Sequence, residues 1–308
     1  PALNLRVPLV YDPLYSAPLP SSHRFPMAKF RQLRDCLESY GLARPQQFHR
    51  PLPCPRSWLE LVHERNYHKA FAQGKLDRAA QRRIGLPATK PLVRRTWLAV
   101  GGTVLTARLA LQNGLACHLA GGTHHAFPGY GSGFCIFNDI AVAARVLLEQ
   151  GLVKRLLVVD LDVHQGDATA VIFEADRRVF TFSAHSASNF PSRKQRSDFD
   201  LPLPDGMEDQ DYLQAIGNVL PELLDLHQPD LVLYNAGVDP HRDDRLGKLS
   251  LSDQGLLLRD HLVIDACLRR NIPLASVIGG GYDTLSPLVK RHALVFRAAT
   301  DQARLHGL

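Results

Sequence analysis

The sequence predicts an α/β protein in which one mostly parallel sheet is covered by helices on both faces. Short apolar runs alternate with amphipathic stretches along the chain, and this alternation is typical of strands joined by crossover helices. The runs are apolar throughout, as expected for strands that are buried on both faces. A chain of 308 residues is a common length for one such unit, and no stretch resembles a linker. We therefore predict a single domain over residues 1–308.

The predicted elements follow one another in a regular order. The strand-like runs are residues 7–11, 115–119, 156–159, 179–182, 231–234 and 274–278. The amphipathic stretches, in which apolar residues recur with helical spacing, are residues 95–112, 139–150, 211–227 and 252–270. Three stretches rich in proline, glycine or polar residues are expected to be irregular: 43–55, 184–206 and 239–250.

Composition and charge exclude several classes of protein. The net charge of +6 comes from dispersed basic residues without a nucleic-acid-binding motif, which indicates a solvated basic surface and no nucleic-acid partner. The five cysteines are scattered and form no CxxC pair, which argues against a disulfide framework or a thiolate zinc site. Residues 1–6 lack the layout of a secretory signal, and no apolar stretch could cross a bilayer. We expect a soluble cytoplasmic protein without a membrane partner.

Polar clusters follow five of the predicted strands. The carboxyl ends of parallel strands meet at one edge of a sheet, where ligands of such folds bind. Five polar loops at one edge therefore predict a site. The clusters begin with Gly121, Asp160, Ser183, Asn235 and Gly279.

The segment Asp-Leu-Asp-Val-His-Gln-Gly-Asp at residues 160–167 predicts a metal centre within this site. Asp162 and His164 are two residues apart, so in an extended segment their side chains point to the same side. Burying such ionisable groups is unfavourable unless a cation offsets the cost. Asp239 is the expected third ligand, although an aspartate at a strand end is often a turn former or helix N-cap. Three oxygen and nitrogen ligands with an open position are typical of a catalytic metal.

Two adjacent histidines, His124 and His125, follow a Gly-Gly turn and could supply acid–base chemistry. Imidazole titrates near neutrality, so one ring could accept a proton from metal-bound water while the other stabilises charge. Such rings need orienting partners, and Asp160 and Asp167 are the available carboxylates.

Aromatic residues beside glycines could complete the site. Tyr282 follows three glycines, and its phenol could donate to an oxyanion, although it could instead pack on the sheet. Phe134 and Phe190 are either core residues or walls of a narrow channel that leads to the metal. The Gly131-Ser132-Gly133-Phe134 stretch favours the channel, because glycines beside an aromatic ring suit a close-packed rim.

Four segments together resemble the zinc-dependent histone deacetylase superfamily. They are GGTHHAFPGYGSGFCIFND from Gly121, DLDVHQGDAT from Asp160, NAGVDPHRDDRLGKLSLS from Asn235, and GGGY from Gly279. The resemblance runs from Tyr11 to the last helix and implies the three-layer arginase-deacetylase fold. It also implies one catalytic Zn²⁺ per chain and a structural K⁺.

The resemblance implies a role for each matching residue. Asp162, His164 and Asp239 would bind zinc. His125 would act as general base and acid, with His124 as its electrostatic partner and with Asp160 and Asp167 holding the two rings. Tyr282 would polarise the scissile carbonyl. Potassium would be bound, partly through backbone carbonyls, by Asp160, Asp162, His164, Ser183 and Ala184. Residues matching the substrate channel are Gly133, Phe134, Phe190 and Leu246.

Within the superfamily, class IV deacetylases and their bacterial relatives are the most similar branch. The evidence is the short chain, the VHERNYHKAF segment, Gln165 and DRLGKLSLS. Leu246 stands where polyamine deacetylases have an acidic residue, which favours acyl-lysine over a cationic polyamine. Gly166 and Gly237 stand where the arginases, which share the fold, place aspartates of a two-metal site. A two-metal guanidino hydrolase is therefore not expected.

The sequence thus predicts a zinc-dependent amide hydrolase that acts on acetyl-lysine or longer acyl-lysine in proteins and peptides. Small-molecule amides such as acetylpolyamines are the alternative substrates within the enzyme class. A non-catalytic protein that binds acyl-lysine is a further alternative. The acyl length, the physiological substrate and the oligomeric state are left open by the sequence.

Overall fold

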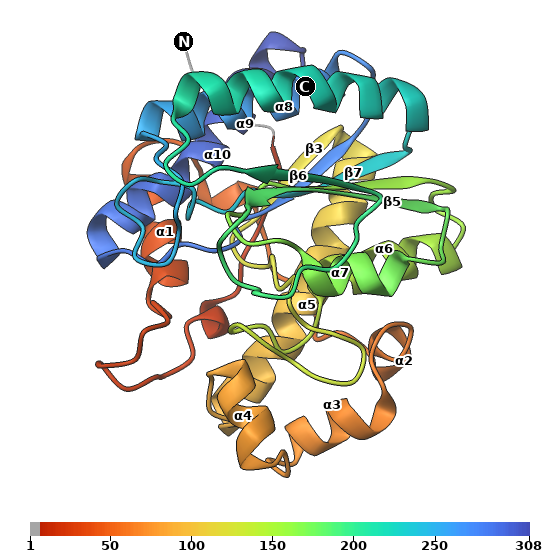
Figure 1. Cartoon of the computed structure of the whole chain (residues 1–308), viewed down its shortest axis with the longest axis vertical. Coiled ribbons are helices and arrows are strands. Elements are labelled where there is room, and N and C mark those ends of the chain that lie inside the picture. Colours follow the sequence, from red (N-terminus) through yellow and green to blue (C-terminus); the bar gives the residue numbers. More distant parts are fainter. Residues whose placement is uncertain (1–6) are drawn as a thin grey trace.

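The computed structural model describes residues 7–308 and contains one eight-stranded sheet in that range (Figure 1). Every pairing between neighbouring strands is parallel. The strand order is β2-β1-β3-β8-β7-β4-β5-β6. The strands are β1 (Leu9–Val10), β2 (Phe48–His49), β3 (Leu115–His118), β4 (Leu156–Asp160), β5 (Val179–Ser186), β6 (Phe199–Leu203), β7 (Leu231–Asn235) and β8 (Leu274–Val277).

Helices cover both faces of this sheet and so form three layers (Figure 1). On one face lie α1 (Lys29–Ser39), α8 (Asp209–His227), α9 (Asp253–Leu268) and α10 (Leu285–Leu305). On the other lie α5 (Lys90–Asn113), α6 (Asp139–Glu149) and α7 (Asp167–Phe173). The short helices α2 (Arg56–Leu59), α3 (Arg65–Ala72) and α4 (Arg78–Ile84) lie beyond α5. Two 3₁₀ turns, η1 (Pro13–Tyr15) and η2 (Pro45–Gln47), complete the elements of residues 7–308.

The local sequence explains where the main helices begin and end. The side chain of Thr89 accepts a hydrogen bond from the Leu92 amide at the start of α5, and Gly114, at φ +81°, ends that helix. Asn138 and Ser252 cap α6 and α9 in the same way. The central strands β3, β4, β7 and β8 are buried at every position, which accounts for their apolar sequences.

The predicted fold class is confirmed, with all six predicted strands and all four predicted helices present. Helix α5 begins five residues before the predicted start because Pro91 fits in the first turn of a helix. The prediction that residues 184–206 are irregular was wrong in part, because β5 extends to Ser186 and β6 lies at Phe199–Leu203. The predicted loop at 43–55 contains η2 and β2. The single-domain assignment stays a prediction, and residues 1–6 lie outside the described range.

The topology brings four loops together at the carboxyl edge of the sheet. Strands β3, β8, β7 and β4 are consecutive neighbours, although β3 and β8 are far apart in sequence. The loops that follow these strands carry the His-His pair, the triple glycine, Asp239 and the segment at residues 160–167. The predicted convergence of polar loops is therefore a property of the fold.

Candidate metal centre and active site

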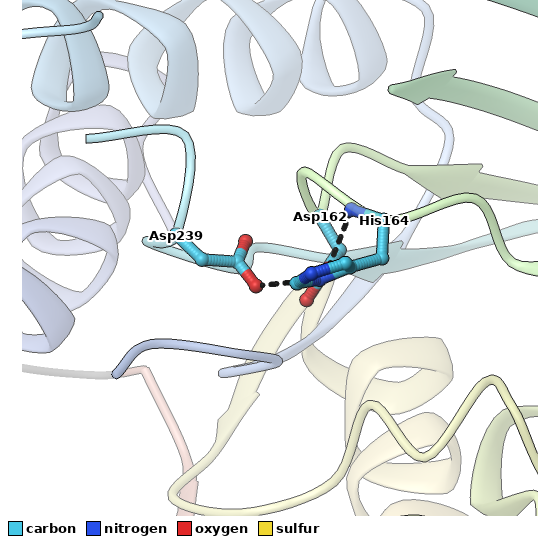
Figure 2. A group of neighbouring side chains, drawn as sticks. All are labelled: Asp162, His164 and Asp239. Carbon is cyan, nitrogen blue, oxygen red and sulfur yellow. Dashed lines mark hydrogen bonds and ion pairs between the residues drawn. The ribbon is translucent and has the colours of Figure 1, made fainter. Parts of the chain in front are cut away.

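Asp162, His164 and Asp239 form a buried cluster whose ligand atoms all lie within 4.8 Å of one another (Figure 2). The Nδ1 atom of His164 is 3.0 Å from Oδ1 of Asp162 and 3.1 Å from Oδ2 of Asp239. Two carboxylates and one imidazole are a donor set that suits zinc, and three protein ligands leave a position for water or substrate. The residues therefore fit the metal that the sequence predicts.

The charges of the cluster also call for a cation. Burial and the neighbouring Asp162 carboxylate raise the pKa of Asp239 to about 7, whereas His124 and His164 hold the pKa of Asp162 well below its usual range despite burial. Two buried carboxylates this close repel each other unless a positive charge lies between them. A divalent cation would stabilise both in their ionised forms.

Glycine is required where the loops approach the cluster. A Cβ atom on Gly237 would lie 2.9 Å from the Cα of Asp162, and one on Gly280 would overlap Oδ2 of Asp239. A Cβ on Gly166 would overlap Oδ2 of Asp160. An aspartate could not replace Gly166 without moving Asp160, which supports one catalytic metal over two.

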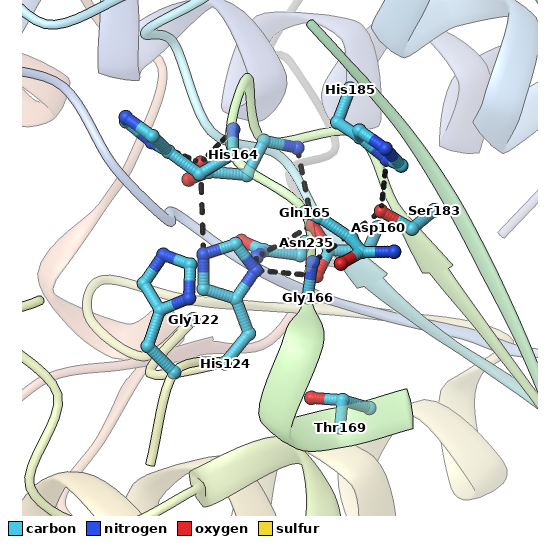
Figure 3. Close-up of polar contacts among 12 residues, drawn as sticks. Gly122, His124, Asp160, His164, Gln165, Gly166, Thr169, Ser183, His185 and Asn235 are labelled. Atoms are coloured by element: carbon cyan, nitrogen blue, oxygen red, sulfur yellow. Dashed lines mark hydrogen bonds and ion pairs between the residues drawn. The ribbon is translucent and has the colours of Figure 1, made fainter. Parts of the chain in front are cut away.

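Each of the adjacent histidines has its own aspartate. The Nδ1 atom of His124 lies 2.6 Å from Oδ2 of Asp160 (Figure 3), and the Nδ1 atom of His125 lies 2.6 Å from Oδ1 of Asp167. The two imidazole rings are 4.1 Å apart between centroids. Asp160 ends β4 and Asp167 begins α7, so the short loop between these elements positions both partners.

The two histidines differ in protonation. Burial alone would lower both pKa values, but the carboxylates of Asp160 and Asp162 raise the pKa of His124 to about 9. Burial and the charge of His124 lower the pKa of His125 to about 4, because Asp167 offsets these effects only in part. The neighbouring carboxylates therefore favour the charged form of His124, whereas burial favours the neutral form of His125.

The predicted aromatic residues lie around the same centre. The Phe190 ring is 5.0 Å from His125 and 6.3 Å from His164 between centroids, and 46% of Phe190 is exposed. The Phe134 ring is 5.7 Å from Tyr282, whose ring is 6.3 Å from His164. Gly133 packs closely against the rings of His125 and Phe190. A Cβ at this position would lie 3.0 Å from Cδ2 of His125 and 3.1 Å from Cε1 of Phe190. Aromatic rings therefore flank the path to the cluster.

Tyr282 and Leu246 are held by neighbouring loops. The backbone amide of Tyr282 donates to Oδ2 of Asp244 at 2.7 Å, and burial raises the pKa of the Tyr282 phenol well above its usual range. The Asn189 side chain donates to the Leu246 carbonyl at 2.6 Å, which ties the loop of Leu246 to that of Phe190.

The residues assigned to potassium are also close together and buried. Asp160 of β4 and Ser183 of β5 are opposite each other in the sheet register, and the Gly166 amide donates to Oγ of Ser183 at 3.4 Å. The His185 ring contacts the same hydroxyl at 2.9 Å (Figure 3). This grouping is compatible with the predicted site, which stays a proposal.

The roles of several buried polar residues of the site were not predicted from the sequence. The Asn235 amide donates to Oδ1 of Asp160 at 3.0 Å, and its place at the end of a strand beside the ligand loop was the available signal (Figure 3). Lys29 and Arg259 are buried near the metal cluster, yet both lie in helical sequences that contain other charged residues.

A small cavity is lined both by predicted channel residues and by Asp162 of the metal cluster. Its volume is about 50 Å³, and its lining includes Phe134, Tyr282, His125, Asp162, Lys29 and Phe30. The Lys29 ammonium donates to the Gly279 carbonyl at 3.3 Å and lies 5.4 Å from the centre of the Phe25 ring. Burial lowers the pKa of Lys29 to about 8.

The fold and the site define an α/β protein with a candidate metal centre at the carboxyl edge of its parallel sheet. The sequence of residues 23–298 matches the family model of the histone deacetylase domain. The chain therefore belongs to the histone deacetylase family, and the predicted family is confirmed.

The chain is also similar to several known proteins. The chain is 57% identical to an uncharacterized protein of Picosynechococcus over 96% of this chain and 98% of that protein. It is 29% identical to histone deacetylase 2 of Arabidopsis thaliana, over 90% of this chain and 75% of the relative. The identity to the acetoin utilization protein AcuC of Staphylococcus aureus is also 29%, over 91% and 78%. The solved HDA15 HD domain shares the fold at a TM-score of 0.81 and 22% identity, over 98% of this chain and 93% of that one.

Within residues 7–308, no helix is both long enough and apolar enough to span a membrane.

Proposed function

We propose that this protein is a zinc-dependent deacylase that hydrolyses the amide of acetyl-lysine in proteins or peptides. The observation that carries the proposal is the convergence of the Asp162–His164–Asp239 cluster with two His–Asp pairs and a tyrosine at one edge of the sheet. A zinc ion held by the three ligands would polarise the amide carbonyl and lower the pKa of a water molecule.

His125 has the properties of the general base. Its Nδ1–H donates to Asp167, which leaves Nε2 as the free nitrogen, and its low pKa keeps the ring neutral at physiological pH. A neutral ring can accept a proton from water and later return it to the leaving lysine amine. Asp167 fixes the ring and stabilises its charged form in between.

His124 and Tyr282 would stabilise negative charge at the reacting centre. His124 is held by Asp160, and Nε2 of His124 lies 3.7 Å from Oδ1 of Asp162, so its charge faces the metal cluster. The high pKa of Tyr282 keeps its phenol protonated and able to donate to the carbonyl oxygen of the substrate. Phe134 and Phe190 would enclose the aliphatic part of the lysine side chain and exclude water.

The inner cavity supports acetyl as the acyl group. One water needs roughly 10–15 Å³ of such space, so a cavity of about 50 Å³ has room for only a few small groups. A long acyl chain would have to displace the Lys29 side chain from its partners. A structural K⁺ bound by Asp160, Asp162, His164, Ser183 and Ala184 is part of the same proposal.

A rate comparison tests this function. Purified protein is assayed with acetyl-lysine, long-acyl-lysine and acetylpolyamine substrates, with and without a zinc chelator. We expect hydrolysis of acetyl-lysine that the chelator abolishes and added Zn²⁺ restores. Faster hydrolysis of acetylpolyamine would favour the small-molecule alternative, and binding of acetyl-lysine without chelator-sensitive hydrolysis would favour the non-catalytic alternative.

A further inference from the structure

A wide groove opens beside the proposed substrate channel. Its volume is about 970 Å³, and residues 16–28 form most of one wall, which is the long red loop in Figure 1. Arg245, Asp283 and Leu285 line the other wall. The groove is therefore bounded by three segments far apart in the sequence: residues 16–35, Arg245 and residues 283–285.

The groove adjoins the channel through aromatic residues. Phe25 lines both the groove and the inner cavity, and its ring is 5.5 Å from Phe134 between centroids. His23 also lines the groove, with its ring 6.4 Å from Phe134. On the opposite wall, the Arg245 amide donates to the Tyr282 carbonyl at 3.4 Å. A polypeptide with a lysine in the channel would thus have its flanking residues at this groove.

The cations of the groove are exposed and free to bind a ligand. Arg24, Arg31 and Arg245 line it, and none of them forms an ion pair with a carboxylate of residues 7–308. In the same range these three side chains also donate no hydrogen bond to a protein acceptor. Their guanidinium groups therefore face solvent unneutralised.

The acidic residues of the groove are already engaged. Asp283 pairs with Arg291, which belongs to the buried surface of α10, and also accepts from the Thr284 amide at 2.6 Å. Asp35 pairs with Arg34 at 3.4 Å. The groove therefore presents three unpaired positive charges and no unpaired negative charge among its described residues.

We propose that this groove receives the polypeptide that flanks the acyl-lysine and selects acidic side chains there. Guanidinium groups recognise carboxylates through paired hydrogen bonds, and an unneutralised positive groove repels lysine-rich and arginine-rich segments. The proposal rests on the proposed function and specifies its substrate class as acyl-lysine in an acidic sequence. A basic tail is the least favoured substrate.

Matched peptides test the proposal. Each carries one acetyl-lysine, with flanking residues that are acidic, neutral or basic, and both kcat/KM and the dissociation constant are measured at low and high salt. An exposed ion pair changes binding about 1.4- to 5-fold, so three arginines predict an acidic-over-basic ratio of roughly 10-fold or more at low salt. The ratio should shrink at high salt because exposed charges are screened.

Charge-reversal variants test whether the arginines of the groove cause the preference for the acidic peptide. In Arg24→Glu/Arg245→Glu the acidic-over-basic ratio should be lost or inverted, and in Arg177→Glu it should equal that of the wild type. Arg177 is exposed and precedes β5, at the opposite edge of the sheet from the site. Because each ratio is taken within one protein, a change in the fraction of folded protein cancels.

The outcomes separate this proposal from the proposed function. Equal rates and affinities for the three peptides, or a preference for the basic one, would overturn the groove assignment while leaving a deacetylase. Absence of hydrolysis of every peptide and of free acetyl-lysine would overturn the proposed function. In that case tighter binding of the acidic peptide still supports the groove assignment, and equal binding of the three peptides overturns that assignment. Displacement of the acidic peptide by an oligonucleotide with higher affinity would also overturn it.

Discussion

The Nη1 atom of Arg259 lies 2.6 Å from the carbonyl oxygen of Gly237. The same atom is 3.4 Å from the carbonyl oxygen of Leu161, and the guanidinium pairs with Asp260 at 2.9 Å. Leu161 precedes Asp162, and Gly237 is two residues before Asp239, so one fully buried side chain of α9 contacts both loops that carry the metal ligands. Arg259 therefore fixes the distance between ligands that come from β4 and β7.

Replacing Arg259 with methionine should weaken metal binding and the fold together. The change leaves the two carbonyls and the Asp260 carboxylate without their buried partner, which costs roughly 3–5 kcal/mol of unfolding free energy. Loss of a residue that orients ligands typically lowers metal affinity about 10- to 100-fold. Zinc titration against a competing chelator and chemical denaturation measure the two effects.

Arg269→Met is the matched control, because Arg269 directly follows the last residue of α9 and its side chain is 70% exposed. Arg269→Met should change neither the zinc affinity nor the unfolding free energy appreciably. Unaltered zinc affinity in Arg259→Met would show that the ligand loops hold their spacing without this contact.

Tyr282→Phe should separate catalysis from metal binding. The substitution removes only the phenol oxygen, while the backbone contact of Tyr282 with Asp244 and the ring contact with Phe134 are retained. Loss of one donor to an oxyanion typically lowers kcat about 10²- to 10³-fold. Zinc content, measured by elemental analysis, should match the wild type.

Tyr130→Phe provides the comparison for this variant, since Tyr130 is exposed and its ring stacks on Phe127. Its kcat should equal the wild-type value. A Tyr282→Phe protein with full turnover would remove the phenol from the mechanism.

The metal ligands could be predicted from the sequence because they depend on short-range patterns. Asp162 and His164 are two residues apart after a buried strand, and Asp239 follows another strand, so the sheet alone brings them to one edge. Arg259 and Lys29 could not be predicted as buried. A helix carries exposed and buried positions in turn, and no local pattern shows that a charged residue faces the interior.

The missed elements have a similar physical reason. Strand β6 contains Asp200 and Pro202 and pairs only with β5, so it is an edge strand without an apolar run. Asp244 lies in the charged sequence Arg242–Arg245, which is typical of a solvated loop, although the Asp244 carboxylate accepts from the Tyr282 amide. Such roles depend on tertiary contacts that the sequence pattern does not contain.

Buried neutral histidines should make the protein sensitive to acid. The Asn138 amide donates to Nε2 of His63, whose Nδ1 lies 3.1 Å from the Phe127 carbonyl, and burial lowers the pKa of His63 to about 4. The unfolded chain takes up this proton below its ordinary pKa of about 6.5, whereas the folded protein does so only near 4. Stability is therefore complete above about pH 6.5 and is lost progressively as the pH falls toward about 4.

At about pH 5 the unfolding free energy should be lower than at neutral pH by roughly 2 kcal/mol because of His63. Chemical denaturation at the two pH values measures it. His63→Gln should reduce the difference between the two free energies by about this amount, and His49→Gln, at an exposed position, should leave it unchanged. An identical pH dependence in His63→Gln and the wild type would mean that His63 takes up its proton at the same pH in the folded protein as in the unfolded chain.

Lys29 should set the acyl length that the enzyme accepts. Its ammonium donates to the Gly279 carbonyl and lies 3.4 Å from Nε2 of His292, and its side chain lines the same small cavity as Asp162 and Tyr282. Lys29→Ala removes this chain and opens space for further methylene groups. The ratio of hexanoyl-lysine to acetyl-lysine turnover should then rise about 10-fold or more, because one methylene in an apolar pocket changes selectivity by this order.

Lys29→Met distinguishes volume from charge. Methionine fills nearly the same space without the ammonium, so this variant should retain the preference for acetyl-lysine if the cavity volume sets the limit. A hexanoyl preference in both variants would instead assign the limit to the buried charge, which disfavours an apolar chain beside it. If neither substitution changes the ratio of kcat/KM values, the acyl group does not enter the cavity that Lys29 closes.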